Sequence, residues 1–108
     1  MQRCKKRLMK TYEVVVLQIA RSDIRDARRW YNTQQQGLGK KLITDMADTL
    51  RRIARNPTSF AIRYKNVRLV NFHTFPYAAH FYIDDISEKV FVIAFLHSSR
   101  DFDAIKDR

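Results

Sequence analysis

The chain has 108 residues, 45% of them hydrophobic, which suits one globular domain with a single core. Its 21 lysines and arginines exceed its 11 aspartates and glutamates, and the formal net charge of +10 favours partners such as phosphate backbones or acidic proteins. Cys4 is the only cysteine, which excludes an internal disulfide and a cysteine-based zinc site, so we expect a cytoplasmic protein without metal or cofactor. The longest apolar run, residues 90–96, is too short to cross a membrane.

The first ten residues are rich in lysine and arginine and lack the apolar stretch of a signal peptide. Two interpretations stay open. Residues 1–10 are a basic extension without fixed structure that touches phosphate, or translation begins at Met9. In both cases the remaining sequence is basic, so we place the folded domain at residues 11–108.

A strand followed by a helix is predicted at the start of this domain. Residues 11–19 are β-branched and apolar, which predicts a strand buried on much of both faces. Ser22 suits the N-cap of the next helix, and Asp23 would lie in its first turn, where a negative charge suits the helix dipole. We interpret Trp30 and Tyr31, near the end of this helix, as side chains that pack it on a sheet.

A second, longer helix follows a break at residues 32–39, which holds both glycines of the chain. Gly37 suits a position with positive φ just past the first helix. Apolar residues recur at helical spacing from Leu38 to Ile53, and Asn56-Pro57 ends the helix because the residue before a proline avoids the α conformation. The opposite, polar face holds Lys40, Lys41, Asp45, Asp48, Arg51, Arg52 and Arg55.

Three strands rich in Val, Ile, Phe and Tyr are predicted in the second half of the chain, at residues 67–72, 77–84 and 89–97. A turn at residues 84–88 joins the last two strands, and residues 101–108 suit one short helical turn. The order β-α-α-β-β-β indicates an α+β fold, with a two-helix hairpin packed on one face of a small, mostly antiparallel sheet that the first strand joins. The opposite face would then be open to a partner.

Four segments, in this order and spacing, resemble the RelE/ParE toxin superfamily, in the branch of plasmid stabilisation proteins. They are residues 27–31 (Ala-Arg-Arg-Trp-Tyr), 37–39 (Gly-Leu-Gly), 75–77 (Phe-Pro-Tyr) and 96–100 (Leu-His-Ser-Ser-Arg), and the likeness extends over about residues 12–108. The resemblance implies the same β-α-α-β-β-β fold and the toxin of a type II toxin–antitoxin system. It also implies an acidic antitoxin, whose bound segment we expect between the helical hairpin and a sheet edge, in a hetero-oligomer or on a toxin homodimer.

The resemblance implies one of two targets for such a toxin. RelE-like members cleave mRNA on the ribosome, whereas ParE-like members inhibit DNA gyrase and need no nuclease site. Residues 75–77 and 96–100 look more like the ParE side, and residues 63–65 match the closely spaced lysine pair of RelE-like nucleases only in part. We therefore favour gyrase and keep ribosome-dependent mRNA cleavage as the alternative, with a non-toxic basic binding module as a third possibility.

Metal-free RNA cleavage would use the 2′-OH as nucleophile and needs a base, an acid and cations for the phosphate. His80 and Tyr82 share one face of their predicted strand, and we expect His97 and Arg100 near that face. Each of these residues also has a structural interpretation, as a hydrogen-bonded histidine, a half-buried tyrosine or a solvated arginine. The candidates are His97, Tyr82, Arg68 and Arg100 for catalysis, only if the protein is a ribonuclease, and Arg63, Lys65, Arg68 and His80 for binding nucleic acid or another target.

Overall fold

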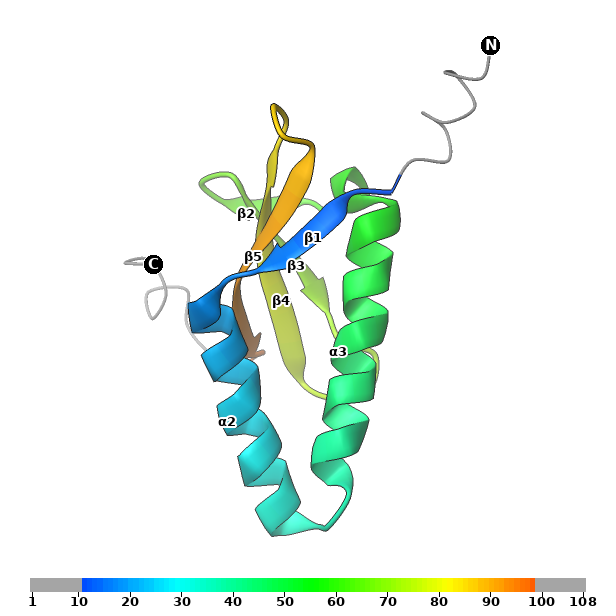
Figure 1. The fold of residues 1–108 in the computed structure, drawn as a ribbon, viewed down its shortest axis with the longest axis vertical. Helices are drawn as coiled ribbons and strands as arrows, with labels where there is room; N and C mark the ends of the chain where they lie inside the picture. The colour runs from blue at the N-terminus through cyan, green and yellow to red at the C-terminus, as the bar shows by residue number, and fades with distance from the viewer. Residues whose placement is uncertain (1–10, 99–108) are drawn as a thin grey trace.

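The computed structural model describes residues 11–98, and the predicted basic extension and the C-terminal helical turn lie outside this range. Figure 1 shows two long helices beside a curled sheet. In chain order the elements are β1 (Glu13–Val16), α2 (Gln18–Gln34), α3 (Leu38–Arg55), the 3-10 helix η1 (Pro57–Ser59), β2 (Ile62–Tyr64), β3 (Val67–Asn71), β4 (Tyr77–Asp84) and β5 (Lys89–His97).

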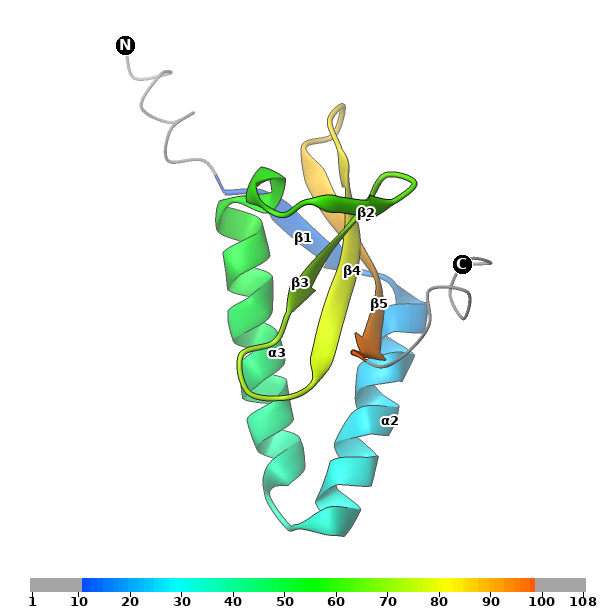
Figure 2. The same cartoon turned by 180° about the vertical axis from the view of Figure 1, so that it is seen from behind.

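The five strands form one sheet in the order β1-β5-β4-β3-β2. β1 runs parallel to β5, and all other neighbours are antiparallel. Both helices lie on the same face of the sheet, as the two opposite views show (Figures 1 and 2). The predicted α+β fold, a helical hairpin on a mostly antiparallel sheet, is confirmed, with one further short strand, β2, that the sequence did not predict.

The hydrophobic core fills the space between the helices and the sheet. The amphipathic stripe of α3 contributes Leu42 and Ile53, which are fully buried. Along β4 the members of this core alternate with residues of the other face, as a strand with a period of two requires. The core also includes Ala20, Ile24 and Ala27 of α2 and Val70, Phe72, Phe75, Ala79, Phe81, Val90, Val92 and Phe95.

A bulge interrupts the pairing of the two central strands. His80 pairs with Ala94, but the next residue, Phe81, pairs with Val92, so Ile93 is an extra residue in β5. Val92 faces the helices before the bulge and Phe95 faces them after it. After Ile93, the side chains of β5 therefore alternate between the two faces of the sheet with a shift of one residue.

The boundary between β1 and α2 differs from the prediction of a strand over residues 11–19 and a cap at Ser22. β1 ends at Val16, and α2 begins at Gln18 with Leu17 as its N-cap residue. The Leu17 amide still donates to the Val92 carbonyl of β5, 3.0 Å away, while the Leu17 carbonyl accepts from the Arg21 amide, also at 3.0 Å, and so begins the helix. The Ser22 hydroxyl donates to the Gln18 carbonyl within the helix, so it is an interior residue and not a cap.

The turn between the helices and the end of α3 agree with the sequence. Gly37 has φ +92°, a left-handed conformation that glycine adopts without steric cost, and its neighbour Leu38 begins α3. Asn56 caps the C-terminal end of α3, and Pro57 begins η1. The short link between α2 and α3 keeps the two helices antiparallel neighbours.

Asp45 was predicted on the polar face of its helix, but it is buried, with 7% of its surface exposed. Its carboxylate accepts hydrogen bonds from three consecutive backbone amides of the loop between β3 and β4, those of His73 (3.1 Å), Thr74 (2.8 Å) and Phe75 (2.9 Å). Hydrogen bonds to an ionised group are shorter and stronger than neutral ones. Asp45 therefore fixes α3 to the sheet through this loop.

We expect Asp45→Ala to lower the free energy of unfolding by about 2–3 kcal/mol, because three amides lose a charged acceptor. Asp85→Ala, in the exposed β4–β5 turn, is the matched control, and we expect it to change stability by less than about 0.5 kcal/mol. Urea unfolding followed by circular dichroism measures both values. Equal midpoints for the two variants would contradict the role assigned to Asp45.

Candidate functional site

His80 lies on the face of the sheet that the helices do not cover. It belongs to β4, is 3% exposed, and its Nδ1 atom lies 3.1 Å from the Tyr64 hydroxyl, within hydrogen-bonding distance. Tyr64 packs in turn against a small second cluster on this face, formed by Ala94 and Leu96. The buried ring of His80 is thus held by a side chain of the short strand β2.

Tyr82 shares this face with His80, as predicted, because Ala79 and Phe81 of the same strand point into the core on the helical side. The Tyr82 ring stacks on Phe91 of β5, with 5.4 Å between the ring centroids. The tyrosine is half-buried, so the predicted structural interpretation and the predicted catalytic one both remain compatible with its position.

Arg68 is engaged with the backbone of the segment that follows α3. One of its guanidinium nitrogens donates to the carbonyl oxygens of Phe60, 2.7 Å away, and Thr58, 3.4 Å away. Its partner in β4 is Phe81, which faces the helices, so Arg68 lies on the opposite face of the sheet from His80. These contacts hold the end of η1 against β3.

Two of the other predicted cations belong to the hairpin of β2 and β3. Arg63 is exposed in β2, and Lys65, with φ +48°, is exposed in the tight turn between β2 and β3. Arg100 lies outside the described residues. Residues 63–65, which match the lysine pair of RelE-like nucleases only in part, therefore lie in a hairpin at the edge of the sheet.

His97 lies on the helical side of the sheet, away from His80. Because of the bulge at Ile93, His97 pairs with Tyr77 of β4, and the centroids of their rings are 5.4 Å apart. The expectation that His97 would join His80 and Tyr82 on one face is wrong. Without the extra residue, His97 would share the face of Phe91 and Tyr82.

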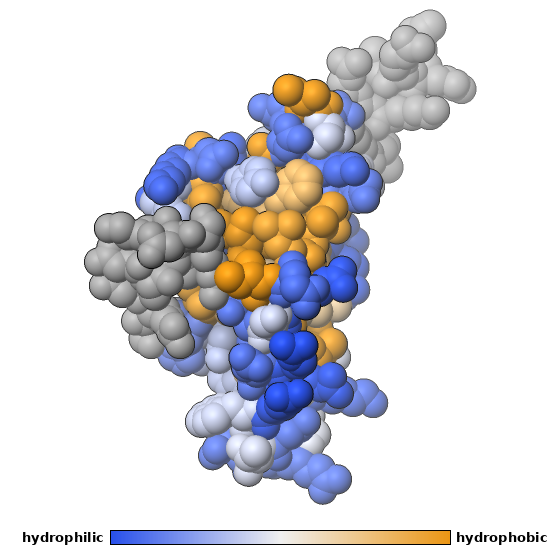
Figure 3. All heavy atoms as spheres, turned by 60° about the vertical axis from the view of Figure 1, so that its left-hand side comes forward, coloured by the Kyte–Doolittle hydropathy of each residue, from blue (hydrophilic) through white to orange (hydrophobic). Residues whose placement is uncertain are grey.

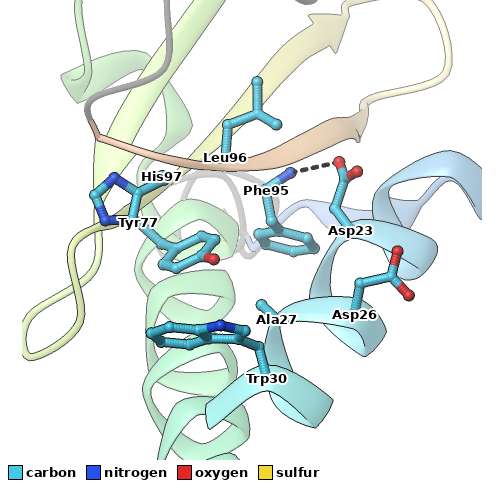
Figure 4. A pocket seen from close by; sticks show the side chains of 8 residues that line it. All are labelled: Asp23, Asp26, Ala27, Trp30, Tyr77, Phe95, Leu96 and His97. Carbon is cyan, nitrogen blue, oxygen red and sulfur yellow. Dashed lines mark hydrogen bonds between the residues drawn. The ribbon is translucent and has the colours of Figure 1, made fainter.

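His97 lines a pocket of about 250 Å³ between α2 and the ends of the central strands, which we call the Trp30 pocket (Figure 4). Asp23, Asp26 and Trp30 come from α2 at helical spacing, so they lie on one face of that helix. The Asp23 carboxylate accepts a hydrogen bond of 3.2 Å from the Phe95 amide, which ties α2 to β5. The lining is completed by Ala27, Tyr77, Phe95 and Leu96.

Trp30 and Tyr31 do not share the packing role that the sequence indicated. Tyr31 packs edge-to-face on Phe75, with centroids 4.9 Å apart, and also contacts Tyr77. Trp30 is 57% exposed and forms one wall of the pocket. The spacing of Asp23, Asp26 and Trp30 was present in the sequence and could have indicated a shared surface, but it does not reveal which strand lies opposite.

A second, larger pocket of about 630 Å³ lies between α3 and the loop that Asp45 holds, and we call it the basic pocket. Its cations are Lys40, Lys41 and Arg51 on α3. His73 lies across from them, with its Nε2 atom 3.2 Å from a carboxylate oxygen of Asp48. This surface carries part of the positive charge that the sequence predicted for α3.

The described residues contain no group of three or more histidines, cysteines, aspartates or glutamates placed to hold a metal ion. Across residues 11–98, neither helix is apolar enough over a sufficient length to cross a membrane.

Two solved structures share the fold. The chromosomal ParDE toxin–antitoxin system from P. aeruginosa superposes with a TM-score of 0.70 at 13% identity, over 81% of this chain and 96% of that chain. The toxin–antitoxin complex RelBE2 from Mycobacterium tuberculosis gives a TM-score of 0.59 at 15% identity, over 81% of this chain and 98% of that one. The architecture is thus that of the RelE/ParE toxins.

The sequence model of the family described as "ParE toxin of type II toxin-antitoxin system, parDE" matches residues 14–102. The chain therefore belongs to the ParE toxin family and is the toxin of a type II toxin–antitoxin system. No curated protein sequence matches it.

We expect Tyr31→Ala to destabilise the fold by about 3 kcal/mol, and Trp30→Ala by less than about 1 kcal/mol, because the first ring is packed in the core and the second is largely exposed. Urea unfolding of the two variants, side by side, measures the difference. A larger loss for Trp30→Ala would mean that its ring supports the fold and does not mainly line the pocket.

Proposed function

We propose that this toxin stops growth by inhibiting DNA gyrase and that it does not cleave RNA. The observation that supports the proposal is the separation of the two candidate histidines by the sheet. His80 is buried against Tyr64 on the open face, whereas His97 lies in the Trp30 pocket on the helical side. A base and an acid on opposite faces cannot act on one phosphate group.

The position of Arg68 supports the same proposal. Stabilising the extra phosphate charge in RNA cleavage requires cationic donors aimed at the reacting phosphate. The Arg68 guanidinium instead donates to the carbonyl oxygens of Thr58 and Phe60, on the face opposite His80. An inhibitor that acts by binding needs no such convergence of acid, base and cation.

Ribosome-dependent mRNA cleavage through 2′-OH attack is the second candidate, and one observation favours it. His80 and Tyr82 share the open face of the sheet, so an imidazole and a phenol lie on one surface of a basic protein. Such a pair could supply proton transfer and base stacking if the ribosome exposed His80 and provided the cations.

We further propose that an acidic antitoxin holds the toxin silent. The two solved structures named above, which share the fold, belong to toxin–antitoxin systems. The formal charge of +10 and the lysines and arginine of the basic pocket favour an acidic segment through charge complementarity. Figure 3 shows hydrophobic residues gathered on one side of the molecule, above the largely hydrophilic end of the helical hairpin, and this patch can supply the apolar part of such a contact. Gyrase and ribosomes are cytoplasmic, so the proposal places the action of the toxin there.

The purified toxin is expected to block supercoiling of relaxed plasmid DNA by gyrase. His97→Ala and Tyr82→Phe should keep this inhibition within about twofold, because neither group is needed for proton transfer in a binding mechanism. In the same preparation, primer extension on mRNA from a translating extract should show no new ends. Codon-linked cuts that disappear in Tyr82→Phe, together with unhindered supercoiling, would establish the second candidate instead.

We expect the gene beside the toxin gene to encode an acidic protein, and growth arrest on induction should be relieved when that protein is expressed with the toxin. The two proteins should co-purify, and the dissociation constant measured by calorimetry should rise several-fold between low and high salt, since surface charge attraction is screened. Replacing Lys40 and Lys41 by glutamate should weaken the complex, whereas Asp85→Asn, far from the basic pocket in sequence, should not. A neighbour that neither binds nor relieves arrest would refute the antitoxin proposal.

A further inference from the structure

We infer that the Trp30 pocket receives the side chain of an arginine carried by the antitoxin. The inference rests on the proposed antitoxin and adds a specific anchoring site for it. A site for a cation is unexpected on this molecule, because a chain with a formal charge of +10 repels cations over most of its surface. A site for a cation therefore needs local features that reverse this preference.

The first such feature is the lining of the pocket. Asp23 and Asp26 both line it, and among residues 11–98 neither a lysine nor an arginine does. Asp26 is exposed on α2, and no hydrogen bond or ion pair joins its carboxylate to another residue of the range 11–98. Asp23 is fixed by the Phe95 amide, so its carboxylate is held beside the pocket. The exposed carboxylate of Asp26, on the same face of α2, is therefore the one that a ligand in the pocket would meet.

The second feature is aromatic. Figure 4 shows the indole of Trp30 below the ring of Tyr77, with Phe95 and the two carboxylates to one side. A cation over the face of a tryptophan is attracted by the negative charge of the ring face, and tryptophan is the strongest such partner among the side chains. Trp30 keeps 57% of its surface exposed, so its ring face is accessible on a helix that otherwise presents mostly polar residues.

Arginine fits these features better than lysine. Its guanidinium is planar, so it stacks on an indole, and its fork of N–H groups pairs with a carboxylate through two hydrogen bonds. A pocket of about 250 Å³ holds a guanidinium and the end of its aliphatic stem. The ammonium group of lysine is more strongly hydrated and can use the carboxylates but not the flat surface of the ring.

The antitoxin is the occupant that the charge pattern favours. An acidic segment is attracted to many positions on a surface of this charge, so attraction alone does not fix where the segment lies. One arginine within that segment, accepted at a negative pocket and repelled elsewhere, would set its register. Exposed tryptophans in pockets are also frequent centres of binding energy at protein interfaces.

The test uses the full chain and two probes, N-acetyl-arginine amide and N-acetyl-citrulline amide, which have nearly the same shape but differ in charge. The chain has one tryptophan, so the indole N–H signal in NMR reports on Trp30 alone. We expect the arginine probe to shift this signal saturably and the citrulline probe to bind at least about fivefold more weakly, as loss of the cation–π and carboxylate contacts requires. Equal binding of both probes would overturn the inference.

A pair of charge-matched variants separates a local site from a general charge effect. Asp26→Asn removes the exposed carboxylate of the pocket, and Asp85→Asn removes one charge from the β4–β5 turn. We expect weaker arginine binding in the first variant only. Equal weakening in both variants would show that the probe responds to net charge, and the pocket would lose its assignment.

Two further measurements decide the occupant. Asp26→Asn and Trp30→Phe should weaken the antitoxin complex several-fold while leaving gyrase inhibition by the free toxin unchanged, so failure of the gyrase proposal and failure of this inference give different results. If Arg100→Gln raises the affinity for the arginine probe, the chain's own arginine occupies the pocket and the antitoxin assignment is wrong. A homodimer in sedimentation that Asp26→Asn dissociates would make a second copy the occupant and would also overturn it.

Discussion

The bulge at Ile93 determines which side chains each face of the sheet presents. β5 lies between β1 and β4, and one extra residue in it reverses the direction of every side chain that follows. Phe95 thereby enters the core, and His97 reaches the Trp30 pocket. The Phe95 amide is then available to Asp23 of α2, so the same irregularity that repositions the histidine also ties the first helix to the sheet.

The order of the elements could be predicted because helical and strand periods are strong in this chain. The apolar stripe from Leu38 to Ile53 and the stop at Asn56-Pro57 depend on local sequence alone, and both agree with the structure. The first strand was predicted too long, because Leu17, Ile19 and Ala20 suit a strand as well as the first turn of a helix, and the helical hydrogen bond from the Arg21 amide to the Leu17 carbonyl is not visible in the sequence. The short strand β2 carries exposed residues and has no apolar period of its own, so its existence depends on pairing with β3.

The candidate site was less predictable than the fold, for a physical reason. The face shared by His80 and Tyr82 follows from the period of a regular strand, and β4 is regular. The face of His97 depends on a bulge, which leaves no glycine or proline in β5 to mark it in the sequence. The burial of Asp45 could not be predicted for a similar reason. A carboxylate on a polar helical face is expected in solvent, and only the amides of residues 73–75, distant in sequence, make its burial favourable.

The place of β5 in the sheet also bears on when the toxin becomes active during synthesis. The last strand in the chain is an interior strand that lies between β1 and β4, so β1 has no neighbour to pair with until β5 has been made. Contacts between distant parts of a chain form late, and domains complete folding only after their segments leave the ribosome. A nascent chain that lacks β5 has neither the complete five-stranded sheet nor the Trp30 pocket, which Phe95, Leu96 and His97 help to line, so no folded toxin exists until the last strand has been made.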